Sequence, residues 1–343
     1  MRHLVIIGNG FDLAHKLETS YIDFIKYIFN NVQHNPTEYK SLFNIYSHIN
    51  YETAQSLIND KNISSHIKFN NPLFEKFFRK TTLENWSDIE ELYFEELKRI
   101  CNNYTNAKNE RLTDLNNEFT DIIKHLEKYL SHIVNNNQIS PIPSLTDFFN
   151  KMKDNQSLVL NFNYSNTISK YITNNNIQQI NLHGQINNTE NPIVFGYAAN
   201  QIESEPLLNT GQKKFTKYIK RYHYKNTNNE KLLRNFLDLT GEINVTILGH
   251  SCGISDSLIL QHIFNHTKVT SIRILYFENR EEYQTKCFNI DRIIKNEQLF
   301  HRKICDFTES HRLPQLNDNQ FQYNEFYTFI DTHFKDKLRH AVG

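Results

Sequence analysis

The sequence predicts an α/β fold, with a doubly wound, mostly parallel sheet and a large helical insertion after the first strand. Three observations support this prediction. Short apolar runs alternate with helical patterns in the second half of the chain, as they do in parallel sheets. The chain opens on one such run, at residues 4–7, and a glycine-rich turn follows it at once. Between these two parts lies a long stretch of helical spacing with almost no glycine.

The opening segment predicts a buried strand, a tight turn and a helix. Residues 4–7 are all apolar and are bounded by glycine, as in a strand inside a parallel sheet. Gly8 and Gly10 permit a sharp turn and a close approach to a ligand. We expect Asp12 to cap the following helix, whose N-terminus would attract a phosphate. The third glycine of the dinucleotide fingerprint is missing, so a plain strand–helix turn is an equal alternative for this segment alone.

Residues 21–153 are expected to form the helical insertion. Thr19 and Ser20 are placed to cap its first helix. Ser87 and Glu90 fit a capping box at the start of a later amphipathic helix. No strand alternation is evident in this part of the sequence. The core that forms the sheet is therefore assigned to residues 1–20 and 154–343.

After the insertion, strand and helix patterns alternate. The predicted strands are 157–161, 178–182, 192–195, 243–248 and 271–277. The predicted helices are 165–173, 229–238, 255–266, 280–296 and, near the end of the chain, 323–340. Because no repeat or linker divides the chain, we expect the first strand to pair with strands that follow the insertion.

The composition argues against several classes of protein. Lys plus Arg equals Asp plus Glu, 38 each, so no net charge draws the chain to nucleic acid or to a membrane surface. No uninterrupted apolar run reaches the roughly 18 residues of a membrane span, and no signal peptide is evident. The four cysteines form no Cys-x-x-Cys pair. This usage predicts free thiols, no metal site and a cytoplasmic location.

Small, amide, hydroxyl or imidazole side chains follow five of the predicted strands. Ligands of doubly wound sheets bind beyond the carboxyl ends of the strands, so we expect these residues to form one nucleotide site. They are Gly8, Asn9, Gly10 and Asp12 after the first strand, Asn161, Asn163 and Ser165 after the second, His183 after the third, Gly196 after the fourth, and Gly249, His250, Ser251 and Asp256 after the fifth.

These strand ends resemble the AbiH family of phage abortive-infection proteins. The resemblance runs over nearly the whole chain, and it implies a role in antiviral defence with a phage-derived trigger. The motifs that carry it are Gly8-Asn-Gly-Phe-Asp-Leu-Ala-His15 with Thr19-Ser-Tyr21, Trp86-x-Asp88-x-Glu90, Asn161-Phe-Asn-Tyr-Ser-Asn-Thr167, Leu182-His-Gly184 and Gly249-His-Ser-x-Gly-Ile-Ser-Asp256.

At a greater distance, the order of these motifs is similar to the sirtuin-like, Rossmann-type NAD-binding fold. By that resemblance Asn163 matches the amide and His183 the catalytic histidine, which implies cleavage of NAD at the nicotinamide–ribose bond by these two residues. The glycine loops match as well: Gly8 and Gly10, then Gly249 and Ser251. Ser165 stands where the sirtuin-like pattern has Asp, and the paired cysteines of the sirtuin zinc module are absent. The resemblance therefore implies NAD binding or cleavage more than deacetylation.

The implied chemistry is physically reasonable. Cleavage at the nicotinamide ribose passes through an oxocarbenium-like state. A neutral histidine, with an ordinary pKa of about 6.5, can polarise a ribose hydroxyl or a water. The amide of Asn163 can hold the attacking water without titrating. Backbone N–H groups at residues 8–10 and 249–251 would take the pyrophosphate.

Several alternatives stay open. His183 fits a hydrogen-bonded strand-end histidine, and Asn161 and Asn163 fit plain turn-formers. Residues 249–253 fit the nucleophile elbow of a serine hydrolase, with Ser251 as nucleophile and Asp306 and His311 as its partners. Basic and aromatic residues at 213–225 suit a single-strand binder, although a basic surface beside the site is favoured. A non-catalytic nucleotide sensor and a homo-oligomer are also compatible with the sequence.

Overall fold

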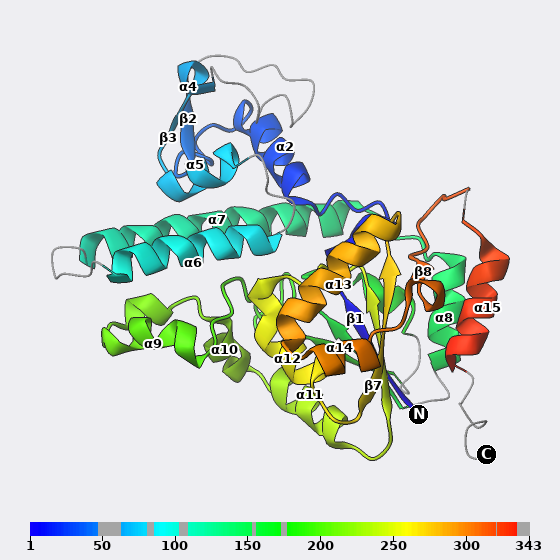
Figure 1. The fold of residues 1–343 in the computed structure, drawn as a ribbon. Helices are drawn as coiled ribbons and strands as arrows, with labels where there is room; N and C mark the ends of the chain where they lie inside the picture. Colours follow the sequence, from blue (N-terminus) through cyan, green and yellow to red (C-terminus); the bar gives the residue numbers. More distant parts are fainter. Residues whose placement is uncertain are drawn as a thin grey trace, which may run out of the picture.

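The computed structural model describes residues 1–46, 63–80, 86–102, 109–152, 156–172, 177–319 and 321–334. At its centre is a six-stranded parallel sheet of order β5-β4-β1-β6-β7-β8 (Figure 1). Numbered along the chain this order is 3-2-1-4-5-6, which is the order of doubly wound dinucleotide-binding sheets. The strands are β1 (Arg2–Ile7), β4 (Ser157–Asn161), β5 (Ile177–Asn181), β6 (Ile243–Leu248), β7 (Val269–Tyr276) and β8 (His311–Arg312). The predicted parallel α/β class is confirmed.

Four of the five strands predicted after the insertion are present, as β4, β5, β6 and β7. The prediction of a strand at 192–195 is wrong. Residues 192–195 form a loop. The N–H of Val194 in this loop donates to the carbonyl of His183 at 2.7 Å. The edge strand β8 was not predicted, since two residues are too short to carry a periodic pattern.

Side chains of the sheet alternate between two apolar layers, as strand geometry requires. Leu4 and Ile6 pack on one face, against helices that follow the later strands. Val5 and Ile7 pack on the other face. The first layer holds α11 (Asn229–Asp238), α12 (Ser257–Phe264), α13 (Arg280–Ile294) and α14 (Glu297–Lys303). The second holds α1 (Asn9–Ala14), α8 (Pro143–Met152) and α15 (Tyr323–Phe334). The predicted helix at 323–340 is present to Phe334, and its remainder lies outside the described residues.

The helices of the insertion lie beyond one end of the sheet, where α6 and α7 run side by side (Figure 1). The insertion also contains a short antiparallel pair, β2 (Phe43–Ile45) and β3 (Ile67–Phe69), so the expectation of a strand-free region is wrong. Its helices are α2 (Tyr21–Val32), α4 (Ile63–His66), α5 (Pro72–Arg79), α6 (Trp86–Asn102) and α7 (Asn109–Asn136). Within the described part of the chain, no helix has the length and apolar character needed to cross a bilayer.

Packing divides the chain differently from the predicted boundary at residue 153. Helix α8 packs on the sheet through Leu145 and Phe148. Conversely, Phe195, Tyr197 and Phe215 of the later chain pack among the helices of the insertion. This later part contains α9 (Gln201–Asn209) and α10 (Lys220–His223). Short 3₁₀ helices complete the fold: η2 (Thr167–Lys170), η3 (Lys213–Thr216), η4 (Tyr224–Asn226), η5 (Ile254–Asp256) and η6 (Phe307–Glu309).

The predicted helix caps have different outcomes. Ser20 caps α2 in a capping box, because its side chain accepts from the N–H of Asp23 at 3.2 Å and its own N–H bonds to the Asp23 carboxylate at 3.1 Å. The capping box at Ser87 is wrong, since α6 already includes Trp86 and Ser87 lies inside the helix. The carboxylate of Glu90 is used elsewhere, as described below.

The turns after β1 and β6 touch each other, and glycine is required where they meet. The N–H of Gly10 donates to the carbonyl of Gly249 at 2.8 Å, and the N–H of Gly8 donates to Leu248 at 3.1 Å. A Cβ on Gly8 would lie 2.5 Å from the Cα of His250. Gly249 has a φ of +67°, and a Cβ there would lie 2.2 Å from the nitrogen of Phe11. Close packing of the two loops therefore accounts for these glycines.

We expect Gly249→Ala to destabilise the fold far more than Gly211→Ala. Both glycines have a φ of +67°, but nothing lies within 4 Å of a Cβ built on Gly211. Backbone strain alone lowers the free energy of unfolding by about 1–2 kcal/mol, and overpacking at Gly249 adds about 1–3 kcal/mol. Urea unfolding of both variants measures the difference. Equal losses would contradict the loop contact.

Candidate functional site

A cavity of about 340 Å³ lies at the carboxyl ends of β1, β4 and β6. It includes the point between β1 and β6 where the strand order reverses, which is where doubly wound sheets bind their ligands. The insertion closes the opposite side with Trp86 and Glu90 of α6 and with Leu130 of α7. Ten of the predicted site residues line the cavity: Gly8, Asn9, Gly10, Asp12, Asn163, Ser165, Gly249, His250, Ser251 and Asp256.

Asn161 does not line the cavity but shapes the turn beside it. Its side-chain oxygen accepts from the N–H of Asn163 at 3.0 Å. Its amide nitrogen donates to the carbonyl of Ser165 at 3.1 Å and to the side chain of Asn181 at 3.0 Å. For Asn161 the geometry favours the turn-former alternative.

His183 also stands back from the cavity, behind Asp256. Its Nε2 lies 3.0 Å from Oδ1 of Asp256 and 3.2 Å from the hydroxyl of Tyr224. Burial lowers the pKa of His183, and the nearby charge of Lys220 lowers it further, against the opposing effect of Asp256. The ring is therefore neutral near pH 7 and donates from Nε2 to the carboxylate. In this position it orients Asp256 and does not line the ligand space.

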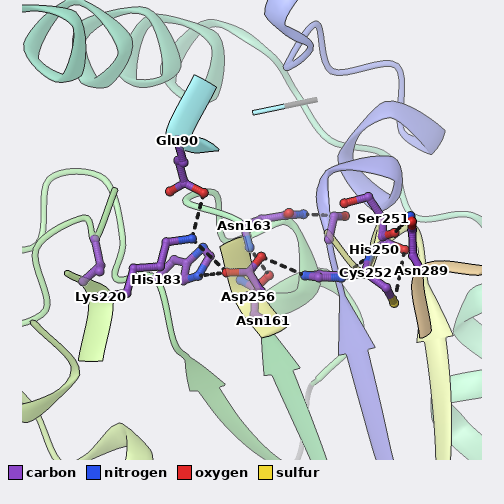
Figure 2. A network of polar contacts seen from close by, with 12 residues as sticks. Glu90, Asn161, Asn163, His183, Lys220, His250, Ser251, Cys252, Asp256 and Asn289 are labelled. Carbon is purple, nitrogen blue, oxygen red and sulfur yellow. Dashed lines mark hydrogen bonds and ion pairs between the residues drawn. The ribbon is translucent and has the colours of Figure 1, made fainter. Parts of the chain in front are cut away.

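A buried cation joins the insertion to the sheet, and sequence reasoning missed it. Nζ of Lys220 lies 2.9 Å from Glu90 and 2.8 Å from Asp256 (Figure 2). The second oxygen of Glu90 accepts from the N–H of Gly196 at 2.9 Å. His250 approaches the second oxygen of Asp256 at 3.5 Å. Lys220 is one of several lysines in the 213–225 stretch, and nothing in the local sequence distinguishes it from its neighbours.

These contacts give the two carboxyl groups different properties. Burial alone would raise the pKa of Asp256, but Lys220, His183 and the hydrogen bond from His250 outweigh it and hold the pKa well below its usual range. Burial raises the pKa of Glu90 to about 7, against the charge of Lys220. Burial opposes the charge on Lys220, yet Asp256 and Glu90 raise its pKa overall. At neutral pH the wall therefore holds an ion pair and one titrating carboxyl group.

The prediction that Asp12 caps its own helix is wrong. Helix α1 begins at Asn9 with Gly8 at the cap position, so Asp12 lies inside the helix. Its Oδ2 accepts from the hydroxyl of Ser165 at 2.5 Å. Burial raises the pKa of Asp12 to about 6, even though Ser165 and the nearby Thr167 lower it. Asp12 therefore lines the cavity, and burial is the main cause of its raised pKa.

Three buried polar atoms of the cavity wall have no hydrogen-bond partner among the residues that the structure describes. They are Oδ1 of Asp12, Oγ1 of Thr19 and Oγ of Ser255. Buried polar atoms are nearly always hydrogen-bonded, and an unsatisfied one costs about 1–3 kcal/mol. These three atoms are therefore available as partners for polar groups of a molecule in the cavity.

The rest of the wall divides into a polar and an apolar part. Lys286 of α13 is buried, with Nζ 3.0 Å from Glu282 and 3.3 Å from the carbonyl of His250. The apolar part includes Trp86, Leu130 and Val134 of the insertion, with Leu13 of α1 and with Ile186 and Phe195 of the later chain. The helical pattern at 280–296 carried no sign that Lys286 faces a cavity, because that depends on how α13 packs against β7.

Some of the backbone N–H groups that we expected to bind a phosphate already donate hydrogen bonds within the protein. The N–H groups of Gly8 and Gly10 are both donated to carbonyls of the β6 turn, so these two donors are already used. Ser251 and Lys286 line the same side of the cavity and carry polar groups.

The parts of a serine hydrolase do not come together. Ser251 lines the cavity, but His311 lines a separate one together with Arg273 and His333. In this turn Gly249 and Cys252 have a positive φ, of 67° and 54°, whereas Ser251 does not. The elbow motif of residues 249–253 is thus not accompanied by His311, the histidine predicted to serve it.

Most aromatic side chains at 213–225 are buried, so they do not form a surface on which the bases of a single strand could stack. Phe215, Tyr218 and Tyr224 are buried, whereas Tyr222 is 43% exposed. Lys214 and Lys217 contact α7. Within the described ranges, no group of three or more His, Cys, Asp or Glu side chains is arranged to hold a metal ion.

The sequence matches one protein family. A model of the family described as "Bacteriophage abortive infection AbiH" matches residues 4–278. No curated protein matches the chain. The matched segment contains all of the predicted site residues, whereas Glu282 and Lys286 lie beyond it.

We expect Lys220→Met to be strongly destabilising, because it leaves two buried carboxyl groups without their cation. The expected loss in the free energy of unfolding is about 3–5 kcal/mol. Lys225→Met is the matched control, since the side chain of Lys225 is 59% exposed and pairs with Glu230 at the surface. Its expected loss is below about 1 kcal/mol. Denaturant unfolding at neutral pH tests both, and similar losses would refute a structural role for the buried pair.

Proposed function

Because this chain belongs to the AbiH family of bacteriophage abortive-infection proteins, we propose that it acts in phage defence by binding NAD in the cavity at the carboxyl edge of the sheet and cleaving its nicotinamide–ribose bond. The observation that carries the proposal is the set of unpartnered buried atoms on Asp12, Thr19 and Ser255 at the switch point of the sheet. Loss of NAD on a phage-derived trigger would halt growth of the infected cell.

The walls of the cavity suit the parts of a nucleotide. Its volume of about 340 Å³ falls in the range of small-molecule sites. The apolar side, with Trp86 and Phe195, suits a planar base. The polar side, with Asp12 and Ser255, suits ribose hydroxyls. The diphosphate would lie near Ser251 and Lys286, because the N–H groups of Gly8 and Gly10 are already bonded.

The electrostatics of the wall suit cleavage of a glycosidic bond. When the bond from C1′ to the nicotinamide nitrogen breaks, positive charge develops on the ribose. Asp256 lines the cavity and stays ionised, so its carboxylate would stabilise that charge. Asn163 would hold the attacking water. His183 would act through Asp256 rather than on the substrate, which makes it a positioning residue.

We expect the purified chain, under an activating condition, to release nicotinamide from NAD, as measured by liquid chromatography. Asn163→Ala should lower kcat by roughly 10²-fold, because the attacking water then lacks the amide that positions it. Asn166→Ala is the matched control, since Asn166 is exposed and does not line the cavity. NAD binding by calorimetry without release of nicotinamide would sink the cleavage proposal and support a sensor. No binding would sink both.

We expect His183→Ala to shift the pH dependence as well as the rate. His183 helps to lower the pKa of Asp256, so its removal should raise that pKa and steepen the fall of kcat/KM at acid pH, because Asp256 then also takes up a proton there. The exposed His262 on α12 provides the control variant His262→Ala. A lower rate with an unchanged slope at acid pH would contradict the role of His183 behind Asp256.

A further inference from the structure

Only one of the two carboxylate oxygens of Asp12 has a hydrogen-bond partner among the described residues. Its Oδ2 is fixed by the hydroxyl of Ser165, which also lies 3.1 Å from the hydroxyl of Thr167. Its Oδ1 has no partner among the described residues, although the side chain lines the cavity and the residue is only 2% exposed. A carboxylate held by one oxygen, with the other free to accept a proton, has the arrangement of a general base.

The other two buried carboxyl groups of the cavity wall, Asp256 and Glu90, lack this arrangement. Both oxygens of Asp256 already have donors, in Lys220, His183 and His250. Both oxygens of Glu90 are also occupied, one by Lys220 and one by the N–H of Gly196. Because their oxygens already accept from protein donors, neither Asp256 nor Glu90 presents an unpaired oxygen to a water in the cavity.

We propose that Asp12 is the proton acceptor in this cavity and that Ser165 is its positioning residue. The proposal rests on the proposed function and assigns a step within it. The bond from C1′ to the nicotinamide nitrogen breaks, and its electron pair stays on the nicotinamide. The oxygen of a water forms a bond to C1′, and the proton of that water passes to Oδ1 of Asp12. Asp12 then returns the proton to solvent, leaving ADP-ribose and neutral nicotinamide.

The surroundings of Asp12 suit this role at neutral pH. Burial raises its pKa to about 6, so it is ionised at pH 7 yet more basic than an exposed carboxylate. The hydroxyls of Ser165 and Thr167 and the amide of Asn163 oppose that shift. The other ionisable groups that line the cavity are Glu90 on α6, Tyr164 after β4, His250 after β6, Asp256 in η5, Glu278 after β7, and Glu282 and Lys286 on α13.

The first test is the pH profile of Asp12→Asn with NAD as substrate. For the unaltered chain, we expect kcat/KM to rise with pH and level off above a midpoint near 6. Asp12→Asn should lose this limb, with kcat lower by roughly 10²–10⁴-fold and KM little changed. Asp238→Asn is the control, since the side chain of Asp238 is 77% exposed on α11.

The second test is rescue of Asp12→Ala by azide, an anion that attacks C1′ without losing a proton. Azide should restore nicotinamide release and yield a ribosyl azide product. A limb near pH 6 that persists in Asp12→Asn overturns the proposal, as does a slow Asp12→Ala variant that folds but gains nothing from azide. An unaltered chain that releases no nicotinamide overturns the proposed function as well. Normal activity in Asp12→Asn overturns the role of Asp12 alone.

Discussion

One buried ammonium group holds together the parts of the chain that form the cavity. Lys220 pairs with Glu90 from the insertion and with Asp256 from the segment after β6 (Figure 2). Removing an ammonium group and two carboxyl groups from water is costly, and only their mutual contact offsets that cost. The insertion is therefore fixed over the carboxyl edge of the sheet by charge as well as by apolar packing. The same contact with Lys220 keeps Asp256 ionised. The interaction that joins the insertion to the sheet therefore also determines the charge of the cavity wall.

The topology of the sheet explains why the cavity lies where it does. Connections leave β1 and β6 in opposite directions, which opens a crevice at the ends of these adjacent strands. The two turns fill part of that crevice themselves, because the N–H of Gly10 bonds to Gly249. In the function proposed here, recognition of a ligand would fall mainly to side chains that line the cavity, such as Asp12, Ser255 and Lys286. This differs from a simple glycine loop, in which free backbone N–H groups hold the phosphate.

Three buried carboxyl groups line one cavity, and their surroundings give each a different protonation behaviour. Asp256 has donors on both oxygens and a cation nearby, so it stays charged. Glu90 has donors too, but burial and the charge of Asp256 keep its pKa near 7. Asp12 accepts a hydrogen bond on one oxygen, and burial raises its pKa to about 6. Separation of pKa values within one pocket is the usual way in which an enzyme assigns acid, base and electrostatic roles to like groups.

Local patterns in the sequence were enough to predict the parallel α/β class and the residues after β1, β4 and β6 that line the cavity. Apolar runs bounded by glycine specify buried parallel strands locally, and in such sheets every carboxyl end faces the same edge. The strand at 192–195 was wrong because its apolar residues pack between loops, and local pattern does not distinguish that burial from a sheet. The bond from Ser165 to Asp12, the position of His183 behind Asp256 and the burial of Lys220 alone among its neighbouring lysines became visible in the three-dimensional structure. Each of them depends on a contact between residues far apart in the chain, and a local pattern does not encode such a contact.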